Sequence, residues 1–275
     1  MDLIDTIPLW AVFLLTALIL ASAFEGGYRA GLSLDKKDEN AKKAPVGAMI
    51  GVVLSLSAFI LAFTFGVASG RFNDRRVLVI KEANAIGTTF LRSELLPDEN
   101  RDEAKKLLRQ YVGIRLRLLQ EKSLNREQLM VGPAVTESKS LQRQLWGQAV
   151  SAGKSNSNSP TVALFIDSLN ETIDLQAERV TAALHARLPG MVWVVLYLLI
   201  SFGMFGLGYQ FGLVGKRNKT ISSIALLSFA MVLMMIADLD RPLEGFMYAS
   251  KQPFLDLGED LGISDSYLST IMKTK

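Results

Sequence analysis

The sequence predicts an all-α integral membrane protein with four transmembrane helices and a helical-bundle extramembrane domain inserted between the second and the third. Four apolar runs are each long enough to cross a bilayer core of about 30 Å as a helix. The residues between the second and third runs are polar overall, but their apolar side chains repeat with a helical period. We therefore expect a first transmembrane pair (1–69), a bundle (70–188), a second transmembrane pair (189–238) and a C-terminal tail (239–275).

Composition excludes several functional classes. The 275 residues carry a formal net charge of only +3, which does not indicate nucleic-acid binding. The chain has no Cys and a single His, His185, so thiolate catalysis, disulfides and His-based metal clusters are ruled out. No phosphate-binding glycine loop is present in the sequence. We expect no enzyme activity, no metal and no other cofactor.

The first apolar run extends from Ile7 to Phe24 and ends near Ala21-Ser22-Ala23, a small-residue sequence of the kind that signal peptidases cleave. The residues before it include Asp2 and Asp5 but no Lys or Arg, so the basic region of a signal peptide is missing. We predict a retained transmembrane helix, followed by a polar loop over 25–44.

The second run, Pro45–Ser69, contains no charged side chain. Its Gly47-x-x-x-Gly51 spacing predicts the close approach of another helix. One face of this helix carries Phe59, Phe63 and Val67, which would form a constriction that gates by dewetting if the helix lined a pore. The alternative for these residues is packing against lipid or neighbouring helices. A rival pore-lining face carries Ser57, Ile60 and Thr64.

The helical period continues beyond the second run. Arg71–Leu96 places its apolar residues on one face, so we predict one long helix that leaves the membrane and stops at Pro97. Further helices are predicted over Glu99–Lys122, Asn125–Met130, Ala134–Ala152 and Thr161–Leu188. Gly132-Pro133 is expected to separate the second of these from the third. The last is expected to pack antiparallel to Arg71–Leu96.

The third and fourth runs, Met191–Val214 and Ile221–Ala237, are joined by a short basic loop. Gly208-x-x-x-Gly212 predicts a further close helix contact. The two short loops carry five and three Lys or Arg residues, whereas the N-terminal flank carries none. By the positive-inside rule the loops face the cytoplasm, and the bundle of a bacterial inner-membrane protein would then be periplasmic.

Charged residues at the membrane ends form candidate sites. Arg71, Arg75 and Arg76 oppose the orientation just given, and they either anchor lipid headgroups or attract anions to a vestibule. Glu82 borders the apolar face of its helix and Asn84 points nearly opposite. For these two residues we expect polar contacts between helices, with ligand binding as the alternative.

The fourth run ends in a second charged group, Asp238, Asp240 and Arg241. Charges at this depth are costly unless they are paired or wet. Arg241 can pair with Asp238 at the i, i+3 spacing, which would make a buried turn that docks the tail. The alternative is an ion-coordinating site.

Four segments together resemble a known family: Glu25–Gly31, Glu82–Gly87, Leu91–Pro97 and Asp238–Gly245. They are similar to the bestrophin-like membrane proteins of bacteria and plants, a family of unknown function distantly similar to bestrophin ion channels. The resemblance implies four transmembrane helices per subunit, a helical domain between the second and third, and a pentamer whose pore is lined by the second helix. It also implies a cytosolic bundle, against the charge argument. Asp238, Asp240 and Glu244 match the calcium-binding sequence of bestrophins only loosely.

We therefore expect a homo-oligomeric, anion-conducting channel with the second transmembrane helix lining the pore. Its partners would be membrane lipid, small inorganic ions and further copies of itself. The alternative is a non-conducting membrane scaffold or sensor whose helical bundle binds a partner. A small-solute transporter is disfavoured because the sequence shows no inverted repeat.

Overall fold

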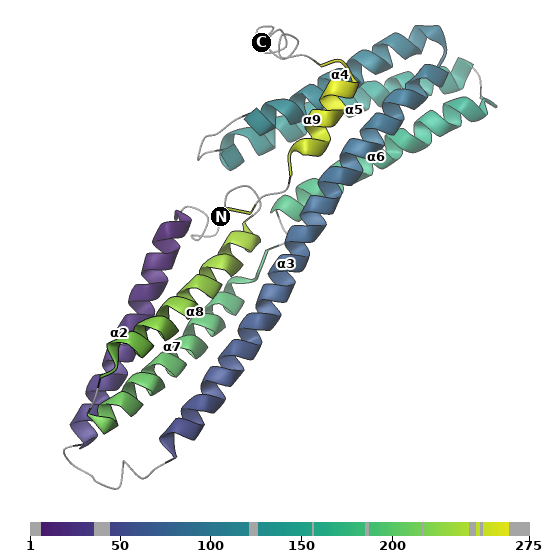
Figure 1. The fold of residues 1–275 in the computed structure, drawn as a ribbon. Coiled ribbons are helices and arrows are strands. Elements are labelled where there is room, and N and C mark those ends of the chain that lie inside the picture. Colours follow the sequence, from purple (N-terminus) through teal and green to yellow (C-terminus); the bar gives the residue numbers. More distant parts are fainter. Residues whose placement is uncertain are drawn as a thin grey trace. The chain divides into compact units, whose positions relative to one another are not determined.

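A computed structural model describes residues 7–35, 45–120, 126–155, 157–184, 187–215, 217–241, 246–247 and 250–263. Residues 36–44 of the first short loop, His185, Glu244 and the end of the tail therefore lie outside the described residues. Within the described part, all regular structure is helical, which confirms the predicted all-α class (Figure 1).

The chain forms two compact units. The membrane unit comprises Met1–Phe72 and Ala186–Tyr248, and the bundle unit comprises Asn73–His185 and Ala249–Lys275. Helix α3 (Val46–Arg92) contributes to both units as one helix of 47 residues, as the unbroken helical period predicts. It ends in the 3₁₀ turn η2 (Ser93–Leu95), and Leu96 then adopts an extended conformation, which is the preference of a residue that precedes proline.

Four helices of the chain are long and apolar enough to span a membrane: α2 (Leu9–Asp35), the first part of α3, α7 (Gly190–Val214) and α8 (Lys219–Asp240). The protein is thus a multi-pass membrane protein. The predicted loop over 25–44 is wrong in its first part, because α2 continues to Asp35. The extra turns are stabilised by the pair Glu25–Arg29, one helical turn apart, and by packing on α7.

Backbone contact between α2 and α7 is the tightest packing in the membrane unit. A Cβ atom on Gly27 would lie 1.9 Å from the carbonyl oxygen of Phe205, and one on Gly208 would lie 2.0 Å from that of Phe24. Only glycine fits at such distances. The close contact predicted for Gly208-x-x-x-Gly212 is confirmed, and its partner is the matching spacing Gly27-x-x-x-Gly31.

The other predicted glycine contact forms only at Gly47 among the described residues. A Cβ on Gly51 would have no atom within 4 Å, and Gly47 faces only the side chain of Gln210. Helix α3 instead approaches α7 by placing the side chains of Ile50 and Leu54 against Gly206 and Gly203. This arrangement fills the space between the helices with side chains and leaves the face of α3 that carries Gly51 open.

The bundle unit is built from the second part of α3 with α4 (Asp98–Gln120), α5 (Arg126–Ser155), α6 (Pro160–Leu184) and the short α9 (Gln252–Asp260). Tyr111 and Phe165 are the largest fully buried side chains of its core. The predicted antiparallel packing of α3 and α6 is confirmed, because Thr89 donates to the carbonyl of Ser168 while Glu82 pairs with Arg179.

The predicted break at Gly132-Pro133 is wrong, because α5 runs through it as one helix. A proline inside a helix removes one backbone hydrogen bond and costs about 3 kcal/mol. The turns that follow bury Leu141, Leu145 and Ala149 in the core of the bundle unit. Burial of these side chains offsets the cost of the proline.

Gly208→Ala is expected to destabilise the membrane unit by about 1–3 kcal/mol, since the added methyl group meets backbone that cannot move aside. Thermal unfolding of the purified protein in detergent measures this as a lower midpoint. Gly51→Ala is the matched control, because its methyl group would have open space and should lower nothing. An equal effect of the two substitutions would contradict the assignment of the α2–α7 contact.

Candidate functional site

Helix α3 carries a continuous stripe of exposed residues along its apolar part. The spacing alternates between three and four residues, which keeps the stripe on one side of the helix. We call this the open stripe; it consists of Met49, Val52, Leu56, Phe59, Phe63, Gly66 and Gly70. In the most apolar part of α3 only 17% of residues are buried, against 28% in each of the other three spanning helices. Among the four described spanning helices, α3 therefore has the smallest buried share.

The two predicted faces of this helix differ in burial. Phe59 and Phe63 are each 67% exposed, whereas Ser57 is 1% and Thr64 4% exposed. The hydroxyl of Ser57 donates to the carbonyl of Val53 at 2.7 Å, so it needs no water to satisfy it. Thr64 does the same with the carbonyl four residues earlier, at 2.8 Å.

The side chains of Val67 and of the three arginines of the basic cluster are buried to different degrees. Val67 is half-buried and packs on the core of the membrane unit, beside the open stripe and not in it. Arg75 is buried, Arg71 is half-buried and Arg76 is exposed. The three arginines thus do not form a single solvent-facing surface within the chain, and Arg76 is the member that faces outward.

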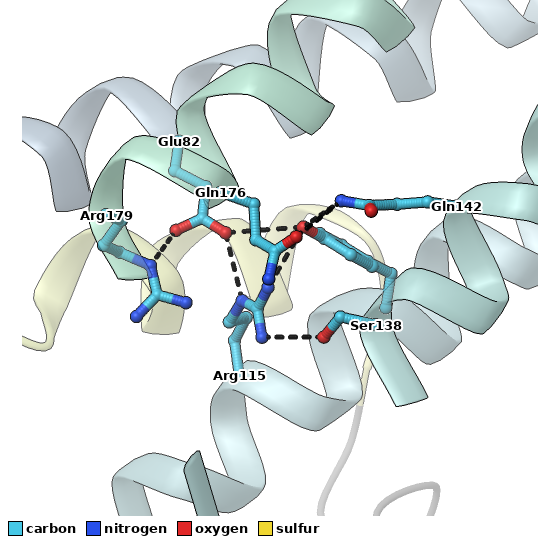
Figure 2. A network of polar contacts seen from close by, with 7 residues as sticks. Glu82, Arg115, Ser138, Gln142, Gln176 and Arg179 are labelled. Carbon is cyan, nitrogen blue, oxygen red and sulfur yellow. Dashed lines mark hydrogen bonds and ion pairs between the residues drawn. The ribbon is translucent and has the colours of Figure 1, made fainter. Parts of the chain in front are cut away.

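A buried polar network surrounds Glu82. Arg115 of α4 donates through Nε to the Glu82 carboxylate at 3.1 Å, and Arg179 of α6 pairs with the other carboxylate oxygen. Figure 2 shows Glu82 between these two arginines, with Ser138 beside Arg115. The hydroxyl of Tyr111 accepts from Arg115 Nη2 at 3.0 Å. The network is completed by Ser138, Gln142 and Gln176, so all four long helices of the bundle unit take part.

Charges in this network decide the protonation state of Glu82. Burial acts to raise the pKa of Glu82, but the charges of Arg115 and Arg179 and their hydrogen bonds outweigh it and hold that pKa below its ordinary value. Glu82 is therefore an anion at neutral pH. Burial raises the pKa of Tyr111, which keeps its hydroxyl protonated. One carboxylate faces two guanidinium groups, so the network carries a net positive charge. Asn84, by contrast, is exposed.

The carboxylates at the end of α8 accept hydrogen bonds from backbone N–H groups of other segments. The carboxylate of Asp238 accepts from the backbone N–H of Phe246 and Met247, at 2.8 and 3.0 Å. Asp240 accepts from the N–H of Leu188 at 2.9 Å. The predicted Asp238–Arg241 pair does not form among the described residues.

Arg241 has a different contact. It donates through Nη2 to the carbonyl of Ile7 at 2.6 Å, which ties the start of the described chain to the end of α8. No group of three or more acidic or His side chains that could hold a metal ion occurs in the described residues. Both Asp238 oxygens are engaged by backbone N–H groups, so this carboxylate holds Phe246 and Met247 at the end of α8.

Arg115 and Arg179 were not predicted from the sequence as partners of Glu82. A signal was present, because Arg115 lies between Ile114 and Leu116, all three of which are buried. A cation in the apolar part of a helix requires a buried partner. The pattern does not say which of the many carboxylates of the chain that partner is.

Comparison with known proteins identifies relatives. The family model of the Bestrophin-like domain matches residues 15–254. Among curated proteins no sequence matches. A bacterial bestrophin homologue from Klebsiella pneumoniae has a similar structure, with a TM-score of 0.64 at 15% sequence identity over 92% of this chain and 98% of that chain. A structure described as a membrane protein gives 0.61 at 14% identity over 90% and 98%. At these identities the likeness shows the fold alone.

Glu82→Gln is expected to destabilise the bundle unit by about 3–5 kcal/mol, because it leaves two buried or partly buried guanidinium groups without a counter-charge. Thermal or denaturant unfolding of the purified protein measures the change. Glu94→Gln is the control, since Glu94 forms an exposed pair with Lys105 and its loss should change little.

The pH dependence of the destabilisation by Glu82→Gln tests whether the loss of the Glu82 charge is its cause. Since the pKa of Glu82 is lower in the folded protein, its contribution is complete above the unfolded-state pKa and is lost as the pH falls towards the folded-state pKa. The difference in stability between the wild type and Glu82→Gln should therefore shrink on acidification below the ordinary carboxyl range. A difference that is constant with pH would mean that the substitution acts through shape and not through charge.

Proposed function

The chain belongs to the bestrophin-like family, and from that premise we propose that it is a homo-oligomeric channel that conducts anions through a pore lined by α3. The family and the four spanning helices support a bestrophin-like channel fold in a multi-pass membrane protein. The proposal adds the oligomer, the position of the pore and the preference for anions.

The open stripe is the observation that carries the proposal. Every other spanning helix contributes more of its apolar part to the interior of the membrane unit. A helix with a continuous open face along its length can surround an axis together with the same face of further copies. A ring of copies closes by rotational symmetry, which leaves a central path along the stripes.

Phe59 and Phe63 would form the constriction of this path. They project from the open stripe one turn apart, so each copy contributes two levels of phenyl rings. A narrow apolar ring blocks ions when it is dry and conducts when it is wet or widened. The rival face with Ser57 and Thr64 is engaged with the chain's own helices, which favours the phenylalanine face as the pore lining.

The preference for anions rests on charge. Arg76 is exposed and follows the open stripe on the same helix, and the exposed Asp74 lies between the end of the stripe and Arg76. In a ring, one such cation per copy would raise the local concentration of anions at the mouth of the path. No carboxylate occurs within the apolar part of α3.

We propose a bacterial inner membrane as the location. The basic short loops favour a cytoplasmic position for themselves and a periplasmic bundle. A bestrophin-like orientation would place the bundle in the cytosol.

The second candidate function is a scaffold or sensor whose bundle binds a partner. It is favoured by Trp146 and Val150, which lie one turn apart on α5 and are both exposed. A scaffold predicts a monomer or a simple dimer and no ion flux.

Liposomes that contain the purified protein are expected to pass chloride faster than empty liposomes. Phe63→Ala should raise this flux several-fold, because it removes one level of the apolar constriction. Phe202→Ala is the matched control, since Phe202 is similarly exposed but belongs to α7. Absence of flux for chloride and for common cations, together with a monomer or dimer on imaging in detergent, would favour the scaffold and overturn the channel.

Cysteine labelling tests the orientation. Because the chain has no Cys, Ser157→Cys places a single thiol in the exposed turn between α5 and α6. A membrane-impermeant maleimide is expected to label it in intact spheroplasts, and Asn218→Cys, at the start of α8, is expected to react only after lysis. The reverse pattern would place the bundle in the cytosol.

A further inference from the structure

The junction of α7 and α8 contains a cavity that the channel proposal does not use. It has a volume of about 730 Å³ and is widely open to its surroundings. Its lining consists of Gln210, Phe211, Val214, Arg217, Asn218, Lys219 and Thr220. Since α7 ends and α8 begins here, and both helices are long and apolar enough to span the membrane, the cavity lies at the level of the lipid headgroups.

The cavity has an apolar wall and a polar rim. Phe211 and Val214 come from the last turns of α7, while Arg217, Lys219 and Thr220 lie beyond its end. Such a division suits a ligand with an apolar chain and a polar head. A soluble ion would use the rim and leave the wall without a role.

Arg217 is held in place from one side. Its Nη1 pairs with Glu25 at 3.0 Å, and its guanidinium carbon lies 5.4 Å from the ring centre of Tyr28 and 5.9 Å from that of Phe24. A guanidinium group has five N–H donors, and these contacts leave several of them for a ligand. The contacts with α2 therefore orient Arg217 in advance of binding.

Positive charge is in excess at this site. Arg217 and Lys219 line the cavity, and Glu25, the ion-pair partner of Arg217, is not among the lining residues. Lys219 has no ion pair among the described residues. Counting the described residues that line the cavity and their ion-pair partners, two cations stand against one anion.

The start of α8 adds to this field. The side chain of Asn218 accepts from the N–H of Ile221 at 3.1 Å and caps the helix. The N–H groups of Lys219 and Thr220 are left without an acceptor in the described part of the chain, and both residues line the cavity. A helix of 22 residues also has the positive end of its dipole here.

We propose that this cavity binds an anionic phospholipid. Its phosphate would lie between Arg217 and Lys219, and the upper part of an acyl chain would lie along Phe211 and Val214. Basic pockets between membrane-spanning helices recognise lipid headgroups by this combination of charge and shape. The site is independent of ion conduction, so its test needs no flux measurement.

The test uses the full-length protein purified in detergent. Mass spectrometry identifies the retained phospholipids, and thermal midpoints are measured while phosphatidylglycerol, phosphatidylcholine or inorganic phosphate is added back. The wild type is expected to retain phosphatidylglycerol in preference to phosphatidylcholine and to be stabilised by it. Lys219→Gln should weaken this binding about fivefold, the factor that one cation contributes near an anionic membrane surface.

Two further variants separate the sources of the phosphate. Arg29→Gln removes the same charge from an exposed side chain that does not line the cavity, and it should leave lipid retention unchanged. Val214→Ser alters the apolar wall and should weaken phosphatidylglycerol but not inorganic phosphate. Equal retention of both phospholipids, or an equal loss with Arg29→Gln, would overturn the proposal. Stabilisation by inorganic phosphate equal to that by phosphatidylglycerol, with no effect of Val214→Ser, would assign the cavity to a soluble anion instead.

Discussion

Contact between the backbones of α2 and α7 is the constraint on which the membrane unit depends. Apolar side chains gain little by leaving lipid for protein, so helices associate in a membrane through close packing. Gly27 and Gly208 provide that packing by bringing each backbone within reach of the other. The other helices pack around this pair. Because α3 meets α7 through the longer side chains of Ile50 and Leu54, it packs less closely and keeps one face open.

Hydrogen bonding within α3 explains why the face that carries the hydroxyl groups of Ser57 and Thr64 is buried and not open. A hydroxyl group in an apolar environment needs a partner, and a helix offers one in the carbonyl of the preceding turn. Ser57 and Thr64 take that partner and are then compatible with burial against neighbouring helices. The side chains of Phe59 and Phe63 have no group that needs a hydrogen-bond partner. They are equally compatible with contact to lipid, to another copy of the chain or to a dry path. Polarity of the side chain is therefore a poor guide to which face of this helix is left unpacked within the chain.

Sequence patterns predicted what depends on local chemistry. The four spans, the unbroken α3 and the antiparallel α6 follow from hydropathy and helical period, because both are properties of each segment's own sequence. Sequence patterns did not predict the features that depend on contacts between residues far apart in the chain. The extension of α2 to Asp35 depends on α7, and the passage of α5 through Pro133 depends on the burial of the turns beyond it. The partners of Glu82 come from helices that begin some 15 and 80 residues further along, and no local rule selects them.

The buried carboxylates of the described residues already have hydrogen-bond partners, which limits the groups that could bind an ion in the proposed channel. Asp238 and Asp240 accept from backbone N–H groups, and Glu82 is held by two arginines, so the carboxylate of each is already engaged. A carboxylate that is engaged in this way holds helices and chain ends in place, and it would have to give up those bonds before it could bind a passing ion. In the proposed channel, the groups that would remain for an ion are exposed ones: the apolar open stripe of α3 and outward-facing cations such as Arg76. An apolar path that is approached past cations excludes other cations by charge and slows anions only by dehydration. Selection for anions would therefore act at the entrance to the path, while the phenylalanine rings would control whether the path is wet.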